Sequence, residues 1–174
     1  MTEMKYLSEK EYTDNAVSNM GVHWKSHRGR WHYHRWAVER VKELNLTEPS
    51  SVLEIGSAGA CIVKGSDTLD YSTHWNMKTW QPKFDWDVKD VPWPFKDNEY
   101  NLIISLRVWQ HLGDKQEAAF REARRVSTGL ILAIPVKYTN GYGVTLEQLI
   151  EWNDGVEPDK HEVSGGTGMY LWTK

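Results

Sequence analysis

Short, mainly apolar segments recur along the chain and are separated by polar or helix-forming sequence. The clearest of these segments lie at 51–55, 100–105 and 129–135. Strands that are apolar on both sides are typical of a parallel sheet covered by helices on both faces, because both faces of each strand are then buried. The sequence therefore predicts an α/β protein with a mostly parallel sheet.

Further strands complete the predicted sheet. They comprise two short early strands and a terminal antiparallel hairpin, at 67–71, 84–87, 161–164 and 169–172. Only about a dozen residues separate the first two strands, so any helix between them has one or two turns. We therefore expect reduced helices between the early strands.

Helix signals lie before the first strand and near two polar capping patterns. Apolar spacing predicts a helix at 31–46, preceded by loop with short helical pieces at 1–30. Asp114 with Glu117, and Thr145 with Gln148, match the capping box and predict helices that run to about residues 126 and 152.

A chain of 174 residues corresponds to about one domain. We expect a single domain with an N-terminal helical cap at 1–46 and a core at 50–174. Cys61 is the only cysteine, which excludes an intrachain disulfide and favours a cytoplasmic location. No apolar segment is long enough to span a bilayer, and no secretory signal is visible, so no membrane partner is expected.

In a parallel sheet, ligands bind beyond the carboxyl ends of the strands. Small residues at 56–60 follow the first strand and would let a ligand approach the backbone closely. Asp70 ends the second strand, where an acid usually accepts hydrogen bonds from the hydroxyls of a ribose. The sequence therefore predicts a nucleoside-type site at this edge.

Several other sites fit the sequence less well. A dinucleotide fingerprint would need glycine at Ala58 and Cys61, and the ending of a P-loop is missing. The pairs His23/His27 and His32/His34 lack a cysteine or patterned carboxylate to complete a tetrahedral set, so no metal is expected.

A longer series of residues resembles the class I S-adenosylmethionine (SAM)-dependent methyltransferases of the small methyltransferase-domain superfamily. The matching residues are Glu54, Gly56, Asp70, Pro94, Phe95, Asp97, Tyr100, Ser105, His111, Leu112, Arg121, Glu122, Arg125, Val126 and Pro135. The resemblance covers roughly 50–135 and implies a Rossmann-like methyltransferase fold, SAM as cofactor and methyl transfer. Ala58 and Ala60 depart from the family by replacing two glycines of the first turn.

The resemblance also implies roles for individual residues. The residues expected to bind the cofactor are Glu54, Gly56, Ser57, Ala58, Gly59, Asp70, Tyr71, Asp87, Val88, Ser105 and Leu106. Asp70 would take the ribose, and Asp87 with Val88 would lie near the adenine. Arg107 and His111 are the candidate catalytic residues, and Trp109 would also line the transfer side. The alternatives are a surface charge for Arg107 and helix packing for His111.

Positive charge is concentrated before the first strand. Residues 21–42 carry a formal charge of +5 in a chain whose net charge is −3. An acidic protein that gathers cations and aromatic rings in one segment is expected to meet an anionic or planar molecule there. Trp24, Arg28, Arg30 and Trp31 are the candidate contacts to the acceptor. The alternative is a solvated helix face that packs its tryptophans inward.

The predicted function is SAM-dependent methylation of an unidentified acceptor, either a small molecule or a macromolecule. Two alternatives remain open: a non-catalytic module that binds SAM, its demethylated product S-adenosylhomocysteine or a nucleotide, and a SAM-degrading enzyme. Carbon-5 cytosine methylation is disfavoured because no Pro-Cys nucleophile is present. Methylation of exocyclic DNA amines usually shows a Pro-Pro motif, which is also missing, although a nucleic-acid acceptor is not excluded.

Overall fold

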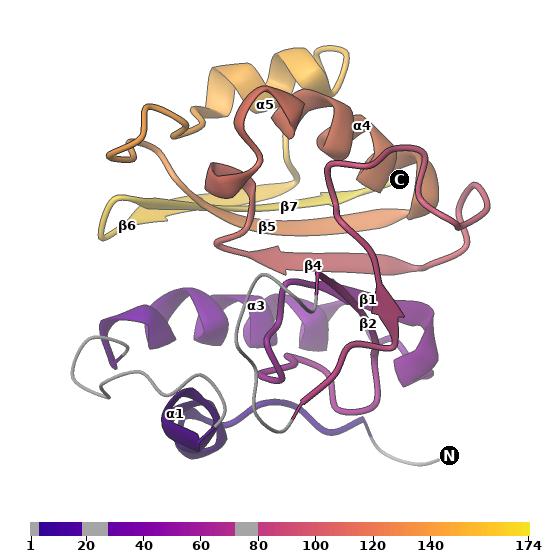
Figure 1. The fold of residues 1–174 in the computed structure, drawn as a ribbon, viewed down its shortest axis with the longest axis vertical. Coiled ribbons are helices and arrows are strands. Elements are labelled where there is room, and N and C mark those ends of the chain that lie inside the picture. Colours follow the sequence, from indigo (N-terminus) through magenta and orange to yellow (C-terminus); the bar gives the residue numbers. More distant parts are fainter. Residues whose placement is uncertain (1–3, 19–27, 72–79) are drawn as a thin grey trace.

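The computed structural model describes residues 4–18, 28–71 and 80–174. Its described part is built around a seven-stranded sheet with the order β3-β2-β1-β4-β5-β7-β6 (Figure 1). The strands are β1 (Val52–Ile55), β2 (Asp67–Asp70), β3 (Phe84–Asp85), β4 (Leu102–Leu106), β5 (Gly129–Pro135), β6 (Lys160–Ser164) and β7 (Thr167–Thr173). The first five are parallel, whereas β7 pairs antiparallel to β5 and β6 pairs antiparallel to β7. The predicted parallel sheet with a terminal hairpin is confirmed.

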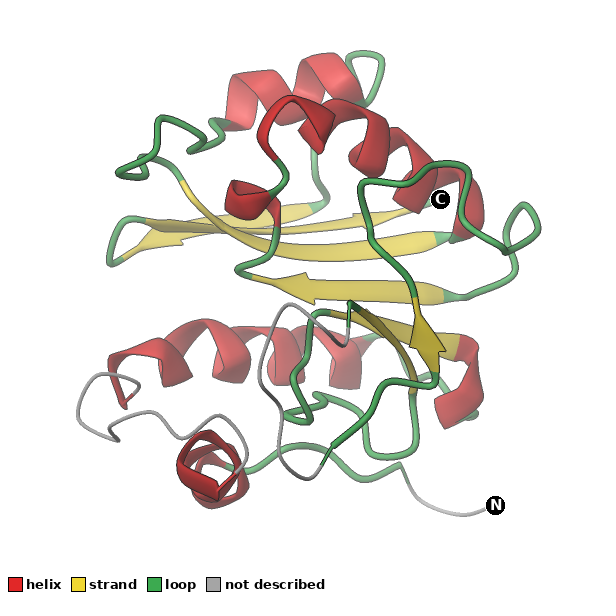
Figure 2. Ribbon diagram, in the orientation of Figure 1, coloured by secondary structure: helices red, strands yellow, loops and turns green. Residues whose placement is uncertain are grey.

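Helices cover both faces of the sheet (Figure 2). Helices α1 (Glu9–Ser18) and α3 (Trp31–Glu43) lie on one face, and α4 (Gln116–Val126) and α5 (Leu146–Trp152) lie on the other (Figure 1). In the described residues no helix joins β1 to β2. The segment 72–79 lies outside the described residues.

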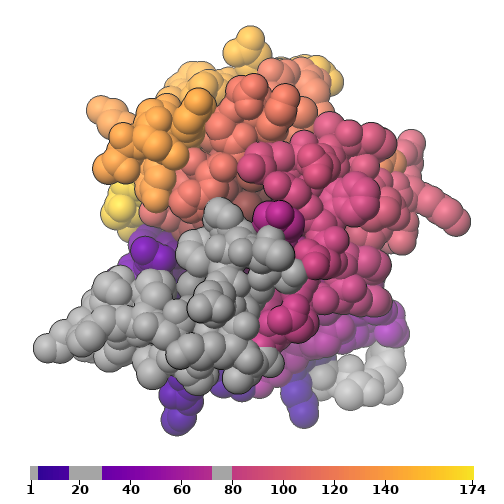
Figure 3. Space-filling model, in the orientation of Figure 1, coloured from indigo at the N-terminus to yellow at the C-terminus, as the bar shows by residue number. Residues whose placement is uncertain are grey.

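Alternate side chains of the central strands enter two separate hydrophobic cores. On β5, Leu130, Leu132 and Ile134 pack toward α4, whereas Ile131 and Ala133 pack toward α3. Successive side chains of a strand point to opposite faces, so each buried strand needs apolar residues throughout. Figure 3 shows the packed surface on the side from which Figure 1 is viewed, with the C-terminal half of the chain at one end of the molecule.

The helix expectations had mixed outcomes. The Thr145 capping box is confirmed: its hydroxyl accepts a hydrogen bond from Gln148 N at 3.3 Å, and Gln148 Oε1 accepts one from Thr145 N at 2.9 Å. The capping box at Asp114 is wrong. A 3-10 turn at Gly113–Lys115 precedes α4, which begins at Gln116 without a side-chain cap.

Two predictions for the N-terminal region also need correction. Residues 9–18 form a regular ten-residue helix where loop with short helical pieces was expected. The helix predicted at 31–46 ends at Glu43. No helix in the described part of the chain is both long enough and apolar enough to cross a membrane.

Candidate functional site

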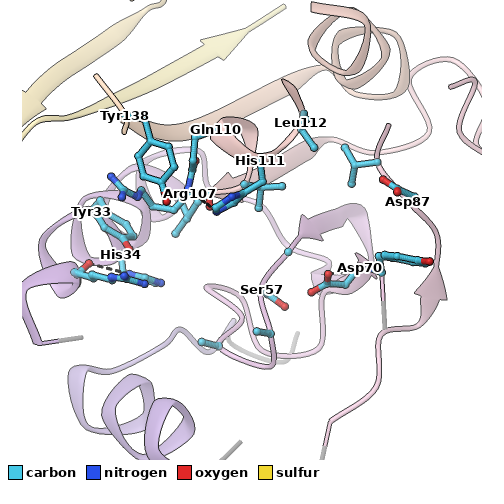
Figure 4. Close-up of a pocket in the computed structure, with 18 of the residues that line it drawn as sticks. Tyr33, His34, Ser57, Asp70, Asp87, Arg107, Gln110, His111, Leu112 and Tyr138 are labelled. Atoms are coloured by element: carbon cyan, nitrogen blue, oxygen red, sulfur yellow. Dashed lines mark hydrogen bonds between the residues drawn. The ribbon is translucent and has the colours of Figure 1, made fainter. Parts of the chain in front are cut away.

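A cavity of about 280 Å³ lies at the carboxyl ends of β1, β2 and β4 (Figure 4). Sheet order reverses between β1 and β4, which is where ligands bind in sheets of this type. The cavity brings together ten of the residues predicted as site residues: Gly56, Ser57, Ala58, Asp70, Tyr71, Asp87, Val88, Leu106, Arg107 and His111.

The turn after β1 forms one wall of the cavity. Gly56 has φ +68° and donates its N–H to the carbonyl of Leu69 at 3.0 Å. A Cβ at Gly56 would lie 2.3 Å from Cγ2 of Val108, so only glycine fits this turn. Ala58 also has a positive φ, of +48°, whereas Ala60 does not. Of the two alanines that replace expected glycines, only Ala58 therefore lies in a conformation that favours glycine.

Glu54 does not line the cavity, although it was expected at the cofactor. Its buried carboxylate accepts hydrogen bonds from the backbone N–H groups of Ile62 and Val63, both at 2.7 Å, and from Ser66 Oγ at 3.0 Å. Burial raises the pKa of Glu54 to about 7, and these three hydrogen bonds oppose the rise. Through these hydrogen bonds, Glu54 fixes the position of the loop between β1 and β2.

Three further expected residues also lie away from the cavity lining. Gly59 is in the same turn as Ala58 but does not line the cavity. Ser105 is buried within the sheet and donates its hydroxyl to the carbonyl of Ile55 at 3.3 Å. Trp109 was expected on the transfer side, but it is buried in the core and donates Nε1–H to the carbonyl of Gln116 at 3.0 Å.

Two acids lie at the end of the cavity formed by β2 and the segment after β3 (Figure 4). Asp70 ends β2, is 6% exposed, and accepts the backbone N–H of Tyr71 at 2.8 Å through Oδ1. Asp87 accepts the backbone N–H of Lys89 at 3.0 Å, and its Oδ2 lies 3.6 Å from Lys89 Nζ. A buried acid and a half-buried acid next to a glycine turn form a suitable site for a polyhydroxylated ligand.

The opposite end of the cavity is aromatic and basic (Figure 4). Its lining residues come from the N-terminal helices, the end of β4 and the segment after β5: Tyr12, Arg30, Tyr33, His34, Arg107, Gln110, His111 and Tyr138. Tyr12, Gln110 and Tyr138 were not predicted as site residues. No local motif marks Tyr12 or Tyr138, whereas the position of Gln110 beside the candidate His111 was an available signal.

Hydrogen bonds define how Gln110 and His111 lie. Gln110 Nε2 donates to the carbonyl of Arg107 at 2.6 Å and lies 3.1 Å from His111 Nε2. Because an amide nitrogen only donates, His111 Nε2 accepts in this arrangement, and the ring proton resides on Nδ1. Gln110 therefore selects one tautomer of His111.

In the described part of the basic segment at 21–42, some side chains line the cavity and others lie on the outer surface of α3. Trp24 and the side chain of Arg28 lie outside the described residues, and Arg30 lines the cavity. Trp31 does not line it and packs against the rings of Tyr12 and His34, with centroids 5.9 and 6.2 Å away. The remaining described arginines of the segment pair along α3, namely Arg35 with Glu39 and Arg40 with Glu43.

The two histidine pairs do not form a metal site within the described residues, which contain no cluster of three or more potential ligands. His23 and His27 lie outside those residues. Nδ1 of His32 donates to the carbonyl of Gly29 at 2.8 Å, and Nδ1 of His34 donates to the carbonyl of Arg30 at 3.0 Å.

Comparison with known proteins identifies the fold. No protein-family model matches the chain, and no curated protein matches it. Among solved structures, the complex between the Haloferax volcanii Trm112 methyltransferase activator and a candidate methyltransferase contains a similar chain, with TM-score 0.59 and 14% identity over 86% of this chain and 92% of that chain. Magnesium protoporphyrin IX methyltransferase from Synechocystis PCC 6803, solved with bound SAM, matches with TM-score 0.58 and 14% identity over 95% of both chains.

The match to a third solved structure covers the whole chain. A candidate SAM-dependent methyltransferase from Methanococcus maripaludis matches with TM-score 0.53 and 16% identity, covering 100% of this chain and 97% of that chain. The protein therefore has the fold of the class I SAM-dependent methyltransferases, as its sequence predicted.

Proposed function

We propose that this protein is a SAM-dependent methyltransferase whose cofactor binds in the cavity at the carboxyl edge of the sheet. The single observation that carries the proposal is the position of Asp70. Its buried carboxylate ends β2 and lines the same cavity as the turn at Gly56. An acid at this point of a doubly wound sheet is suited to accept hydrogen bonds from ribose hydroxyls.

The other residues of this end of the cavity fit the same cofactor. The backbone of the turn, at Gly56 and Ser57, would face the methionine portion, and Asp87 with Val88 would lie beside the adenine. SAM supplies an electrophilic methyl group on a sulfonium: the acceptor's lone pair forms the new bond, and the electrons of the broken S–C bond stay on sulfur. The protein's task is to align the acceptor and exclude water.

The opposite end of the cavity would hold the acceptor. In the arrangement seen here, Nε2 of His111 accepts a hydrogen bond from Gln110, so His111 would not act as a base through Nε2. Any proton that the methylated acceptor carries would pass to bulk solvent when the product is released.

Calorimetric titration tests the cofactor proposal. The Asp70→Ala variant should bind S-adenosylhomocysteine at least tenfold more weakly than the wild type, because charge-assisted hydrogen bonds to the ribose are lost. Asp85→Ala is the matched control: Asp85 ends β3, does not line the cavity, and its removal should leave affinity unchanged. Unchanged affinity in Asp70→Ala, with a native melting temperature, would contradict the assignment.

Activity measurements separate the remaining alternatives. Incubation with SAM alone, followed by product analysis, detects degradation that needs no acceptor. Binding of SAM without turnover across a broad acceptor panel would favour a binding module. No binding of SAM or S-adenosylhomocysteine to the wild type would remove the proposal.

A further inference from the structure

Arg107 lies in a different charge environment from four other arginines of the chain. Arg35, Arg40, Arg121 and Arg125 each form an ion pair. In the described part of the chain, no carboxylate lies within ion-pair distance of Arg107, although this half-buried side chain lines the cavity. A guanidinium that is partly removed from water without a counter-charge is costly unless a ligand supplies that charge.

The backbone of Arg107 is held at both of its polar groups. Its N–H donates to the carbonyl of Ala133 at 2.7 Å, and its carbonyl accepts Nε2 of Gln110 at 2.6 Å. Arg107 also has φ +65°, in the left-handed region that a non-glycine residue adopts only at an energetic cost. Backbone strain of this kind persists where the surrounding structure fixes it and is found most often at functional sites.

The side chain of Arg107 is also oriented before any ligand binds. Its Nη1 donates to Oγ1 of the buried Thr167 at 3.1 Å, and the guanidinium lies over the ring of Tyr138, 5.8 Å from its centroid. Thr167 uses one of five guanidinium N–H donors. In the structure as described, the others make no further hydrogen bond or ion pair with the protein.

The electrostatics of this end of the cavity favour an anion. Arg30 also lines it, and the positive charges of Arg30 and Arg107 both act on Tyr33, opposing the rise in the pKa of Tyr33 that its burial causes. The two acids of the cavity lining, Asp70 and Asp87, lie at the other end (Figure 4). Lys89 also lines that end, with its Nζ 3.6 Å from Asp87 Oδ2, so the charged side chains there sum to −1, whereas Arg30 and Arg107 sum to +2.

We propose that Arg107 binds an anionic group of the methyl acceptor, and that the acceptor is a small aromatic molecule bearing a carboxylate or phosphate. A guanidinium matches either group through two parallel hydrogen bonds. The rings of Tyr33 and Tyr138, with the edge-to-face contact between His111 and Tyr138 at 5.8 Å, provide apolar surfaces for an aromatic body. This inference rests on the proposed methyltransferase function, since it assigns the cofactor to the end near Asp70.

The test uses benzoate, phenyl phosphate and neutral benzamide as probes of the full-length protein saturated with S-adenosylhomocysteine. Ligand-observed NMR should show benzoate or phenyl phosphate binding at least tenfold more tightly than benzamide, and the tighter of the two identifies the anion. Arg107→Gln should lose at least tenfold in affinity for that anion while keeping its affinity for S-adenosylhomocysteine. Arg35→Gln, on the outer surface of α3, is the matched control and should bind like the wild type.

Several outcomes would overturn the inference. These are equal binding of benzamide and both anions, anion affinity that survives in Arg107→Gln, or a loss of S-adenosylhomocysteine affinity in that variant. The last result would assign Arg107 to the carboxylate of the cofactor. If Arg107→Gln does not fold, Arg107→Lys replaces it, because the charge remains but the paired hydrogen bonds are lost, and anion affinity should still fall.

The same titration distinguishes failure of the inference from failure of the proposed function. If the wild type binds no S-adenosylhomocysteine but binds benzoate or phenyl phosphate through Arg107, the methyltransferase proposal fails and the anion site remains. If S-adenosylhomocysteine binds through Asp70 and neither anion binds, the cofactor site remains and the acceptor class is wrong.

Discussion

The two ends of the cavity are built in different ways. The end near Asp70 consists of residues at or just after the ends of β1, β2 and β3, within residues 56–89, and most of them are small or acidic. The end near Arg107 consists of long side chains from four separated parts of the chain, such as Tyr12 on α1 and Tyr138 after β5. A site made of strand ends appears in sequence as a local motif, whereas a site assembled from distant side chains depends on the packing of the whole fold.

Changes at the two ends should therefore have different effects. Substitutions in the first end alter backbone geometry and should affect stability and cofactor binding together. Substitutions in the second end, such as those of Arg107, should affect acceptor binding alone. Changes to the turn after β1, and to Glu54 of β1 that binds the loop following this turn, test this contrast.

Gly56→Ala should have the largest effect. The new Cβ would meet Cγ2 of Val108 at 2.3 Å, and alanine would be held at φ +68°. Left-handed backbone costs about 1–2 kcal/mol and forced overpacking about 1–3 kcal/mol, so the free energy of unfolding should fall by several kcal/mol. Denaturant unfolding measures this change, and titration should show S-adenosylhomocysteine binding lost.

Gly155→Ala is the matched control for that experiment. Gly155 has φ +86°, but its Cβ would have nothing within 4 Å. The free energy of unfolding of Gly155→Ala should fall only by the cost of the left-handed backbone, about 1–2 kcal/mol, and cofactor binding should be kept. Equal losses in the two variants would show that the contact between Gly56 and Val108 is not what makes glycine necessary.

Glu54→Gln should have the next largest effect. The amide NH₂ would face a backbone donor of Ile62 or Val63, and the buried donor left without an acceptor should cost about 1–3 kcal/mol. The exposed Glu117, which pairs with Arg121, provides the control: Glu117→Gln should change stability by less than about 0.5 kcal/mol.

The stability of the Glu54 variant should also depend on pH differently from the wild type. Burial raises the pKa of Glu54 to about 7 in the folded protein from an ordinary value of 4.5, so folding binds a proton between these values. The wild type should lose stability as pH rises through this window, by at most ~1.4 kcal/mol per pH unit. The stability advantage of the wild type over Glu54→Gln should therefore fall as pH rises from 4.5 to 7, and an advantage that grows with pH would contradict the assigned shift.

Ala58→Gly should have the smallest effect and the opposite sign. Ala58 has φ +48°, so glycine relieves strain and should raise the free energy of unfolding by up to about 1 kcal/mol. Ala60 lacks a positive φ and is buried, so Ala60→Gly should instead destabilise by about 0.5–1 kcal/mol. Thermal unfolding of the pair gives the two signs, and equal signs would contradict the interpretation of the turn.

Much of the sheet could be predicted because the signal is local. The segment 129–135 is apolar throughout because both of its faces are buried, and it forms β5 over those residues. Helix α1 was not predicted as one regular helix because, among its described side chains, only Tyr12 is fully buried, so no apolar periodicity marks it. Asp114 matched a capping box but lies in a 3-10 turn, which the same residues can also form.

The candidate site shows the same limit. Asp70 and Gly56 follow strands and were identified from their positions. Glu54 also lies near this edge, but its carboxylate binds the backbone amides of Ile62 and Val63 and does not line the cavity. The pattern of the strand does not reveal this direction of the side chain. Tyr138 was missed because its place beside Arg107 depends on the packing of the segment after β5 against the end of β4.

The central claim is that one cavity holds the cofactor at its acidic end and leaves its basic end for the acceptor. A crystal structure of the complex with S-adenosylhomocysteine tests this claim most directly. It should show both ribose hydroxyls within hydrogen-bond distance of the Asp70 carboxylate, the adenine beside Asp87 and Val88, and no contact between the ligand and Arg107. A ligand that lies elsewhere, or whose carboxylate pairs with Arg107, would contradict the account.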